Sequence, residues 1–187
     1  MNIIHPTAII YGNVKMGENN EIGAYCVIGD KAQVRGCNKI GHVIIGNNNR
    51  LGNFVNIDAG FRNEATLIGD DNMIMHHMHI AGDCKVGSHC NISIGACMGG
   101  RCEIQDYVFL GLGSSIHQRI RIGEGAIVGM GAVVIRDVRP WSKVVGSPSR
   151  RIGDNTIGAQ RAGVTDEYIE KSIMKFYGTG TDIPEGT

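Results

Sequence analysis

The 187-residue sequence contains few aromatic residues, no excess of charge of either sign and no long hydrophobic run. Aromatic side chains make up 5% of the residues, whereas glycine occurs 28 times, a balance that suits many tight turns around a thin core. The 18 basic and 18 acidic side chains cancel, so nothing indicates a nucleic-acid partner or binding to an anionic membrane. Because no run of 18 apolar residues and no signal peptide is found, we expect no membrane span and a cytoplasmic location.

What the sequence does contain is an apolar repeat with a period of six residues. Its central members are Ile68, Ile74, Ile80, Val86, Ile92, Met98, Ile104, Leu110, Ile116, Ile122, Val128 and Val134. A period of six fits neither an α-helix nor a flat strand, and it is typical of a hexapeptide-repeat parallel β-helix. Three hexads complete one triangular coil, so residues eighteen apart stack on one another. We therefore predict an all-β fold, a left-handed parallel β-helix with a short C-terminal α-helical extension.

Mostly small residues form a second repeat, four positions after the large apolar ones. Its members are Cys84, Cys90, Ala96, Cys102, Val108, Ser114, Ala126 and Ala132. Large and small side chains are both expected to point inward, because a narrow prism must fill without voids. Cys26 shares this offset, and a buried thiol behaves as a small hydrophobe, so we expect core cysteines rather than disulfides or a metal site. Cys37 and Cys97 lie off this offset and are expected to be exposed.

The same register runs through the N-terminal part of the chain with two interruptions. Its members there are Ile4, Ile10, Met16, Ile22, Ile28, Val34 and Ile40, followed after a slip by Ile45, Leu51 and Ile57. A second break falls at residues 60–64. Such slips are typical of loops that leave the prism and carry function, although a harmless bulge fits equally well. His5 and Pro6 are expected to blunt the open lower edge, because proline cannot donate to a strand ladder.

The repeat ends near Val134, and the prolines and glycines of residues 139–148 break it. We therefore divide the chain into a β-helix domain over residues 1–140 and a C-terminal helical extension and tail over residues 141–187. Two helical segments are expected in the extension.

The second helical segment has clear start and stop signals. Thr165 is a suitable N-cap, two acidic residues follow in the first turn, and Gly178 is a suitable stop. Ile169, Ile173 and Phe176 share one face, which we expect to lie against the prism or a neighbouring subunit.

Histidines gather in the central repeat, and the offsets of His79, His89 and His117 place them away from the core-facing positions. The histidines are His76, His77, His79 and His89, with His117 further along the chain. A single histidine on the outer wall is often only solvated, but histidine is also the side chain best suited to accept a proton near neutral pH. Residues 99–100 are both glycine and stack above residues 81–82, which leaves bare backbone N–H groups that could hold an oxyanion. A base beside an oxyanion site is the minimum that acyl transfer requires.

Three short segments in the second half of the chain carry recognisable motifs. Residues 79–84 read H-I-A-G-D-C, residues 111–118 read G-L-G-S-S-I-H-Q, and residues 155–163 read N-T-I-G-A-Q-R-A-G. In this order they resemble the H-I-A-H-D-C, G-G-x-x-x-V-H-Q and N-x-E-G-x-x-R-R-G stretches of the UDP-N-acetylglucosamine O-acyltransferases. These are hexapeptide-repeat enzymes that begin lipid A synthesis. The resemblance covers about residues 72–177 and the N-terminal I-H-P-T-A-I segment.

The resemblance implies a set of site residues. His79 would be the active-site histidine that assists substrate binding, and Gly100 would be the backbone donor to the oxyanion. His117 and Gln118 would contact the acceptor.

The resemblance also implies substrates and an assembly. Asn155 and Arg161 would hold a nucleotide sugar, since arginine is well suited to phosphate. Family members are homotrimers with active sites between adjacent prisms, and they take the acyl group from acyl carrier protein.

The sequence departs from the family pattern at several positions. The usual catalytic histidine falls on Gly82, and Arg101, Ile157 and Ala162 also differ from the pattern. Met130 occupies the position where a bulky family residue shortens the acyl chain, so a short acyl donor is expected. The chain is also shorter than is usual in the family.

The leading hypothesis is an acyltransferase that moves a short acyl group from an acyl carrier protein or coenzyme A thioester to a nucleotide-linked sugar. His79 would be the base with His76 in reserve, and no bound cofactor or metal is expected. An alternative is a catalytically inactive nucleotide-sugar-binding or scaffold trimer, which the glycine at position 82 favours. A further alternative is a γ-type carbonic anhydrase, which needs three histidines that converge on zinc, but the histidine spacing does not resemble that family.

Overall fold

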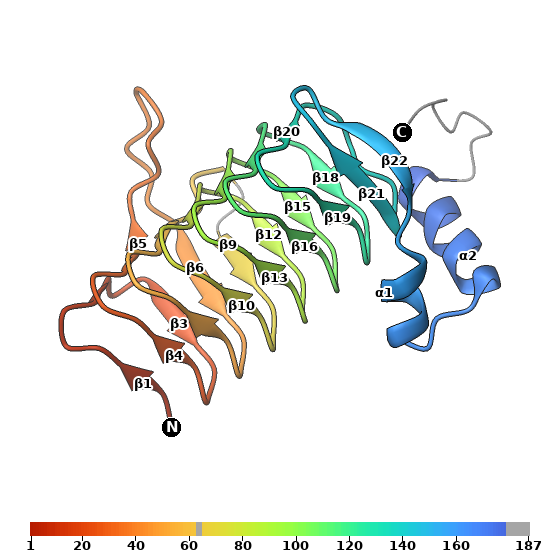
Figure 1. Ribbon diagram of the computed structural model, residues 1–187. Helices are drawn as coiled ribbons and strands as arrows, with labels where there is room; N and C mark the ends of the chain where they lie inside the picture. The colour runs from red at the N-terminus through yellow and green to blue at the C-terminus, as the bar shows by residue number, and fades with distance from the viewer. Residues whose placement is uncertain (63–64, 179–187) are drawn as a thin grey trace.

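The computed structural model describes residues 1–62 and 65–178, and these residues wind into a three-walled prism of short, mostly parallel strands (Figure 1). Each turn of the chain adds one strand to every wall, so residues eighteen apart are ladder partners in the regular coils. The prediction of an all-β, left-handed parallel β-helix with a short C-terminal helical extension is confirmed.

We name the three walls A, B and C, and the corners AB, BC and CA after the walls that they join. Wall A contains β1 (Ile3–Ile4), β4 (Glu21–Ile22), β7 (Arg50–Leu51), β10 (Met73–Ile74), β13 (Asn91–Ile92), β16 (Phe109–Leu110), β19 (Ile127–Val128), β21 (Ser142–Val145) and β22 (Arg150–Asp154). Wall B contains β2 (Ile9–Ile10), β5 (Val27–Asp30), β8 (Asn56–Asp58), β11 (His79–Ile80), β14 (Cys97–Met98), β17 (Ser115–Ile116) and β20 (Val133–Val134). Wall C contains β3 (Val14–Met16), β6 (His42–Ile45), β9 (Ala65–Ile68), β12 (Lys85–Val86), β15 (Glu103–Ile104) and β18 (Arg121–Ile122).

The residues of the hexad repeat form the axis of the prism. All the predicted positions from Ile68 to Val134 are buried, with at most 3% of their surface exposed, and the small residues of the second repeat are buried with them. In the N-terminal coils, the same inward offset holds three buried asparagines that the hydrophobic pattern did not place in the core. Asn49 donates through Nδ2 to Oδ1 of Asn20 at 3.0 Å, and its own Oδ1 accepts from the backbone N–H of Asn72 at 3.0 Å. The asparagines therefore join three consecutive coils.

The predicted register is wrong at Val34 and Ile40, whose side chains are 39% and 57% exposed. Ile45 completes the second coil instead, because its ladder partner is Met16 in the coil below. Residues 31–41 leave the prism between β5 and β6 and form the projection at the upper left of Figure 1. Ile4 is also exposed, because no described coil lies beneath the first one to cover it.

The predicted break before Ile68 is a second excursion, between β8 and β9. Two of its residues, Asn63 and Glu64, lie outside the described residues. Both excursions leave the prism at corner BC and contact each other there: the backbone N–H of Gly41 donates to the carbonyl of Gly60 at 2.7 Å. Corner BC is therefore the place where this chain adds structure to the regular prism.

The cysteines lie where the second repeat places them. Those at the inward offset, Cys26, Cys84, Cys90 and Cys102, are buried free thiols, whereas Cys97 is exposed and Cys37 is half-buried. The buried thiols donate to backbone carbonyls of the next coil, as Cys84 does to Gly99 at 3.2 Å. The described cysteines form no disulfide.

The C-terminal extension differs in its first part from the expected helical segment. Residues 142–154 form β21 and β22, which lengthen wall A because β21 pairs with the otherwise open edge of β19. The buried ring of Trp141 lies over Gly125, where a Cβ atom would overlap the ring. The helices α1 (Thr156–Arg161) and α2 (Asp166–Tyr177) follow. No helix in the described ranges is long and apolar enough to cross a membrane.

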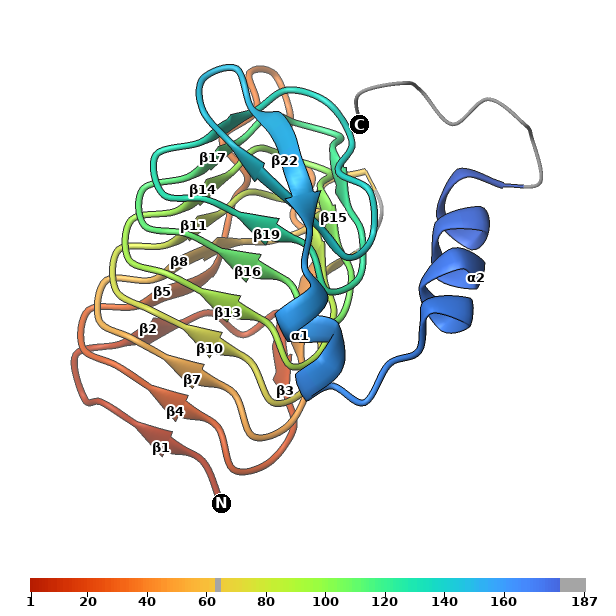
Figure 2. The same ribbon diagram turned by 45° about the vertical axis from the view of Figure 1, so that its right-hand side comes forward.

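The second helix begins and ends as predicted and lies on wall C. Thr165 caps its N-terminus, and Ile173 and Phe176 are buried beneath it. Arg121 of β18 donates through Nη1 to the carbonyl of Phe176 at 2.8 Å and stacks its guanidinium 4.4 Å from the centre of that ring. Glu124 accepts hydrogen bonds from Tyr168 and Ser172. Figure 2 shows α2 beside the end of the prism where these contacts are made, with α1 below β22.

Candidate active site

Wall B carries the histidine that the motif singled out. His79 lies on β11 between Asn56 of β8 and Cys97 of β14, which are its ladder partners. Its neighbour Ile80 points into the core, so the imidazole of His79 lies on the outer face, where it is partly exposed. An outward, partly exposed imidazole can exchange protons with a bound substrate.

The two glycines at residues 99–100 lie one coil above this histidine, at the edge of corner BC. The amide of Gly99 is used in the ladder, since it donates to the carbonyl of Ile116 at 2.9 Å. The amide of Gly100 donates to no residue in the described ranges, and a Cβ atom at this position would find its nearest contact at 3.3 Å. That contact, with the carbonyl of Gly82, is a close one, and Gly100 is partly exposed. Since its backbone N–H has no acceptor within the described residues, it is available as the donor that an oxyanion needs.

His117 and Gln118 complete the wall-B group one coil further up. His117 follows β17, and its backbone N–H donates to the carbonyl of Val134 at 2.8 Å. Nδ1 of His117 donates to the carbonyl of Gln118 at 3.2 Å, which leaves Nε2 as the proton-accepting nitrogen. Adjacent coils are about 4.8 Å apart, so the predicted residues His79, Gly100 and His117 are spread over roughly 10 Å along the prism axis, on wall B and the adjoining edge of corner BC.

The excursions cover the position where the family has its catalytic histidine. A Cβ atom on Gly82 would lie 2.6 Å from the carbonyl of Ala59, 2.9 Å from Ala32 and 3.0 Å from the ring of Phe61. Asp83, the next residue, is also engaged by the second excursion, because its carboxylate accepts from the backbone N–H of Phe61 at 2.8 Å. No side chain larger than hydrogen fits at position 82 unless both excursions move.

Asp58 is a functional candidate that the sequence pattern missed. It ends β8 at the foot of the second excursion, and only 3% of its surface is exposed. Burial raises the pKa of the Asp58 carboxyl, and the nearby imidazole of His79 acts in the opposite direction. The sequence offered one signal, a carboxylate directly after a hexad position and directly before the break in register.

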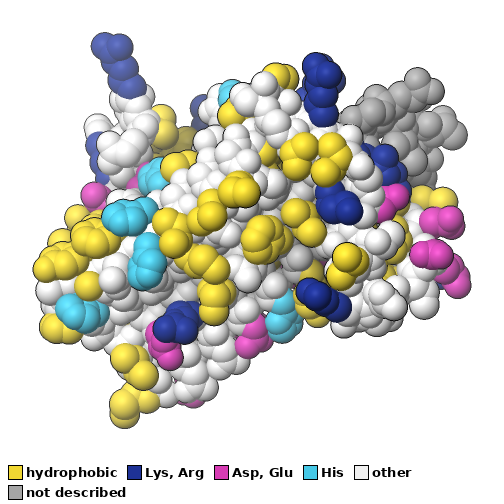
Figure 3. All heavy atoms as spheres, in the orientation of Figure 1, with side chains coloured by type: hydrophobic (Ala, Val, Ile, Leu, Met, Phe, Trp, Pro, Cys, Tyr) yellow, Lys and Arg dark blue, Asp and Glu magenta, His cyan; other side chains and the backbone are white. Residues whose placement is uncertain are grey.

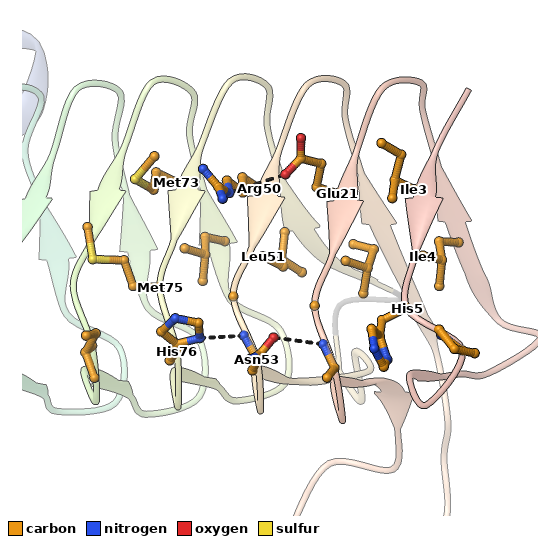
Figure 4. A pocket seen from close by; sticks show the side chains of 17 residues that line it. Ile3, Ile4, His5, Glu21, Arg50, Leu51, Asn53, Met73, Met75 and His76 are labelled. Atoms are coloured by element: carbon orange, nitrogen blue, oxygen red, sulfur yellow. Dashed lines mark hydrogen bonds and ion pairs between the residues drawn. The ribbon is translucent and has the colours of Figure 1, made fainter.

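His76 and Met130, by contrast, lie at corner AB. His76 accepts through Nδ1 from the backbone N–H of Asn53 at 2.7 Å, and Asn53 in turn accepts from Ala24 at 2.9 Å. Figure 4 shows this chain of hydrogen bonds along one side of a groove of about 620 Å³, with the ion-paired Arg50 and Glu21 on the other side. Met130 is 75% exposed. The groove is largely apolar, and its neighbouring surface carries many hydrophobic side chains (Figure 3).

The two residues expected to hold a nucleotide lie in the C-terminal extension. Asn155 is 8% exposed and caps α1: its Oδ1 accepts from the N–H of Gly158 at 3.0 Å, and its Nδ2 donates to the carbonyl of Gly125 at 2.8 Å. Arg161, at the end of α1, is exposed. Gly125 belongs to corner CA, so the pair lies across the prism from wall B, and one chain does not bring these residues to His79.

A zinc site needs several converging ligands. Among residues 1–62 and 65–178, no group of three His, Cys, Asp or Glu side chains is arranged to hold a metal ion. The carbonic anhydrase alternative therefore finds no ligand set in the described part of the chain.

A prism of hexads with an outward histidine on wall B, and in the next coil a glycine amide that has no acceptor among the described residues, fits the class of hexapeptide-repeat acyltransferases. No protein-family model matches the sequence. The chain is 37% identical to the acyl-[acyl-carrier-protein]–UDP-N-acetylglucosamine O-acyltransferase of Thermodesulfovibrio yellowstonii, over an alignment of 214 positions that covers 94% of this chain and 82% of the relative. The chain belongs to the UDP-N-acetylglucosamine O-acyltransferase family.

Two further comparisons agree with this assignment. The chain is 34% identical over 157 residues to the enzyme of the same name from Burkholderia vietnamiensis. The alignment covers 82% of this chain and 60% of that relative. The chain thus spans about 60% of the length of this relative. The solved structure of a UDP-N-acetylglucosamine acyltransferase from Bacteroides fragilis superimposes with a TM-score of 0.86 at 26% identity, over 98% of this chain and 73% of that one.

Proposed function

We propose that the protein transfers a short acyl group from a thioester to a hydroxyl or amine of a nucleotide-linked sugar. The observation that carries the proposal is the outward imidazole of His79 on wall B together with the amide of Gly100 in the next coil, at the adjoining edge of corner BC, which has no acceptor among the described residues. The names of the relatives support both substrates, since they specify an acyl-carrier-protein thioester as donor and UDP-N-acetylglucosamine as acceptor. Coenzyme A is the alternative carrier of the same thioester.

The proposed chemistry needs no bound cofactor. His79 takes the proton from the sugar hydroxyl or amine as its oxygen or nitrogen attacks the thioester carbonyl. The carbonyl oxygen becomes an oxyanion and accepts the hydrogen bond of the Gly100 amide. When the tetrahedral intermediate collapses, the carbon–sulfur bond breaks, and the thiolate leaves with the proton held by His79.

We assign the base to His79 rather than to His76. Nδ1 of His76 already accepts the Asn53 amide at 2.7 Å, so its proton resides on Nε2 and its free nitrogen is a donor. His76 therefore stabilises corner AB, where it joins two coils.

The remaining predicted residues fit substrate binding in an assembly of three chains. His117 and Gln118 would contact the acceptor beside His79, whereas Arg161 would bind the diphosphate from a neighbouring chain, with Asn155 holding α1 in place. Exposed apolar residues along wall A and corner AB, such as Met73, Phe109 and Leu112, supply surface for a homotrimer interface. Met130, at the same corner, would limit the length of the acyl chain.

Substitution of the histidine tests the proposal. We expect His79→Ala to lower kcat for acyl transfer from acetyl- or acyl-carrier thioesters to UDP-N-acetylglucosamine by about a hundredfold or more, because general-base catalysis is lost. His89→Ala is the matched control, since His89 lies at corner CA, 3.9 Å from Asp71 and away from wall B. Activity of His79→Ala within a few-fold of the unmodified protein would show that the base is misassigned.

A second candidate function, a sugar-binding trimer without catalysis, is favoured by the glycine at position 82. Its signature is a rise in Tm with UDP-N-acetylglucosamine, by mass action on the folded form, without consumption of any thioester. A thioester-consumption assay on the same samples separates the two functions.

A further inference from the structure

We propose that Asp58 is the carboxylate that stabilises the charged form of His79 through space, a role that compensates for the histidine absent at position 82. The proposal rests on the proposed function and adds to it a residue that favours the protonated base. It also gives a reason why a member of this family can lack the usual base.

The strand register places the two groups together. His79 is the ladder partner of Asn56, and Asp58 lies two residues further along the same strand. Ile57 points into the core, so Asn56 and Asp58 share the outer face with His79. The electrostatic interaction between Asp58 and His79 follows from this proximity. The carboxylate and the imidazole therefore lie diagonally across adjacent strands of one face, near enough to interact electrostatically.

Asp58 is enclosed by the first excursion. Its partner in the strand below is Asp30, whose Oδ1 accepts from the backbone N–H of Lys31 at 2.7 Å. The backbone of Gln33, in the first excursion, acts to lower the pKa of Asp58. The charged groups that face Asp58 are thus Asp30 from β5 and His79 from β11. Desolvation raises the pKa of Asp58, Asp30 adds to the rise, and His79 opposes it.

Such a buried carboxylate is costly to ionise unless a cation lies beside it, and a protonated His79 is the cation available. The carboxylate therefore favours the imidazolium that forms when His79 takes the proton of the acceptor. The proton later leaves with the thiolate. Removal of Asp58 should slow the step in which the imidazolium forms rather than weaken substrate binding.

Position 82 is closed to the usual base by the same excursions that enclose Asp58. Phe61 and Ala59 contact the glycine, and the carboxylate of Asp83 is bound to the backbone of the second excursion. The excursions at corner BC thus account both for the glycine at position 82 and for the burial of the Asp58 carboxyl.

Carboxyl NMR tests the pairing without any assay of activity. Spectra of protein labelled with ¹³C at the aspartate carboxyl, with Asp58 assigned through Asp58→Asn, give the pKa of this group directly. In His79→Gln the pKa of Asp58 should rise further, because the cation that lowers it is lost. An unchanged Asp58 titration would overturn the proposal, even if the protein proves to be a good acyltransferase.

Kinetics and stability of Asp58→Asn test the role. We expect kcat for acyl transfer to fall by about tenfold or more, with KM changed less than about threefold, and Asp58→Glu to recover part of the loss. The same substitution is expected to stabilise the folded protein although it lowers kcat. The pKa of Asp58 is raised above 3.8 in the folded chain, so its ionisation disfavours folding, and this penalty grows as the pH rises through the folded-state pKa. Asp58→Asn should therefore raise Tm at pH 7 more than at pH 4.

A variant with lower kcat and higher Tm cannot be explained by a merely structural carboxylate. Asp71→Asn, at the exposed pair with His89, is the control and should leave both quantities unchanged. Unchanged kcat in Asp58→Asn would overturn the proposal. If the unmodified protein transfers no acyl group from any thioester, the proposed function fails, and the NMR titration still decides whether Asp58 and His79 are paired.

Discussion

At the scale of the residue, the chain differs most from its family at position 82, and its neighbours explain the difference. Gly82 is packed under Ala59 and Phe61, so the glycine is a consequence of the excursions at corner BC. His79 keeps the outward imidazole that the motif implied, and the amide of Gly100 has no acceptor among the described residues. The departure at position 82 therefore removes the usual base and leaves the proposed oxyanion donor in place.

The cysteines give a prediction at the same scale. Burial raises the pKa of Cys26 and raises that of Cys90 to about 12, and the thiolate is the reactive form. A disulfide reagent at pH 8 should therefore modify only Cys37 and Cys97 rapidly in the native protein, and all six thiols once it is unfolded. Rapid modification of four or more thiols in the folded state would contradict the predicted core.

The sequence predicts the orientation of some of these side chains but not the burial of others. The six-residue period places Ile80 inward and therefore His79 outward, whatever the substrate. Asp58 and the asparagines of the core were missed, because a polar residue in a hexad turn is usually solvated and only the stacking of coils decides whether it is enclosed. Asn155 was expected to bind sugar, but its amide is committed to Gly158 and Gly125, contacts that span distant parts of the chain.

At the scale of the element, the two excursions and the second helix are the additions to a regular prism. The break in register predicted that the chain would leave the prism but not that both excursions would meet at one corner. In the first excursion, the chain leaves the prism before Val34, where a strand of wall C was expected. Ile45 takes that place in the ladder beside Met16. The helix α2 was predicted in its limits because its caps and apolar face are local signals.

The attachment of α2 to wall C can be tested at Arg121. Its guanidinium joins Asp137 at 2.8 Å, the carbonyl of Phe176 and the ring of Phe176. We expect Arg121→Ala to lower the free energy of unfolding by about 1–2 kcal/mol and to speed proteolytic removal of α2, because a charge-assisted hydrogen bond and a cation–π contact are lost. The exposed Arg136 offers the control Arg136→Ala. Unchanged proteolysis of α2 in Arg121→Ala would contradict this mode of attachment.

At the scale of the whole molecule, the fold is predictable because one short period repeats through most of the chain, whereas the complete site is not. His79 lies on wall B, and Arg161 lies in the extension anchored at corner CA. These two residues can act on one substrate only if they come from different chains. The proposed homotrimer is therefore a requirement of the proposed function.

The most direct measurement of this claim is complementation between two inactive variants. His79→Ala and Arg161→Ala subunits should be co-expressed in equal amounts, and the mixed trimers purified by two affinity tags and assayed for acyl transfer. If each site takes His79 from one chain and Arg161 from its neighbour, every mixed trimer keeps one intact site of its three and restores about a third of the unmodified activity. If the mixed trimers remain as inactive as either variant alone, the two residues do not share a site between chains, and the account is contradicted.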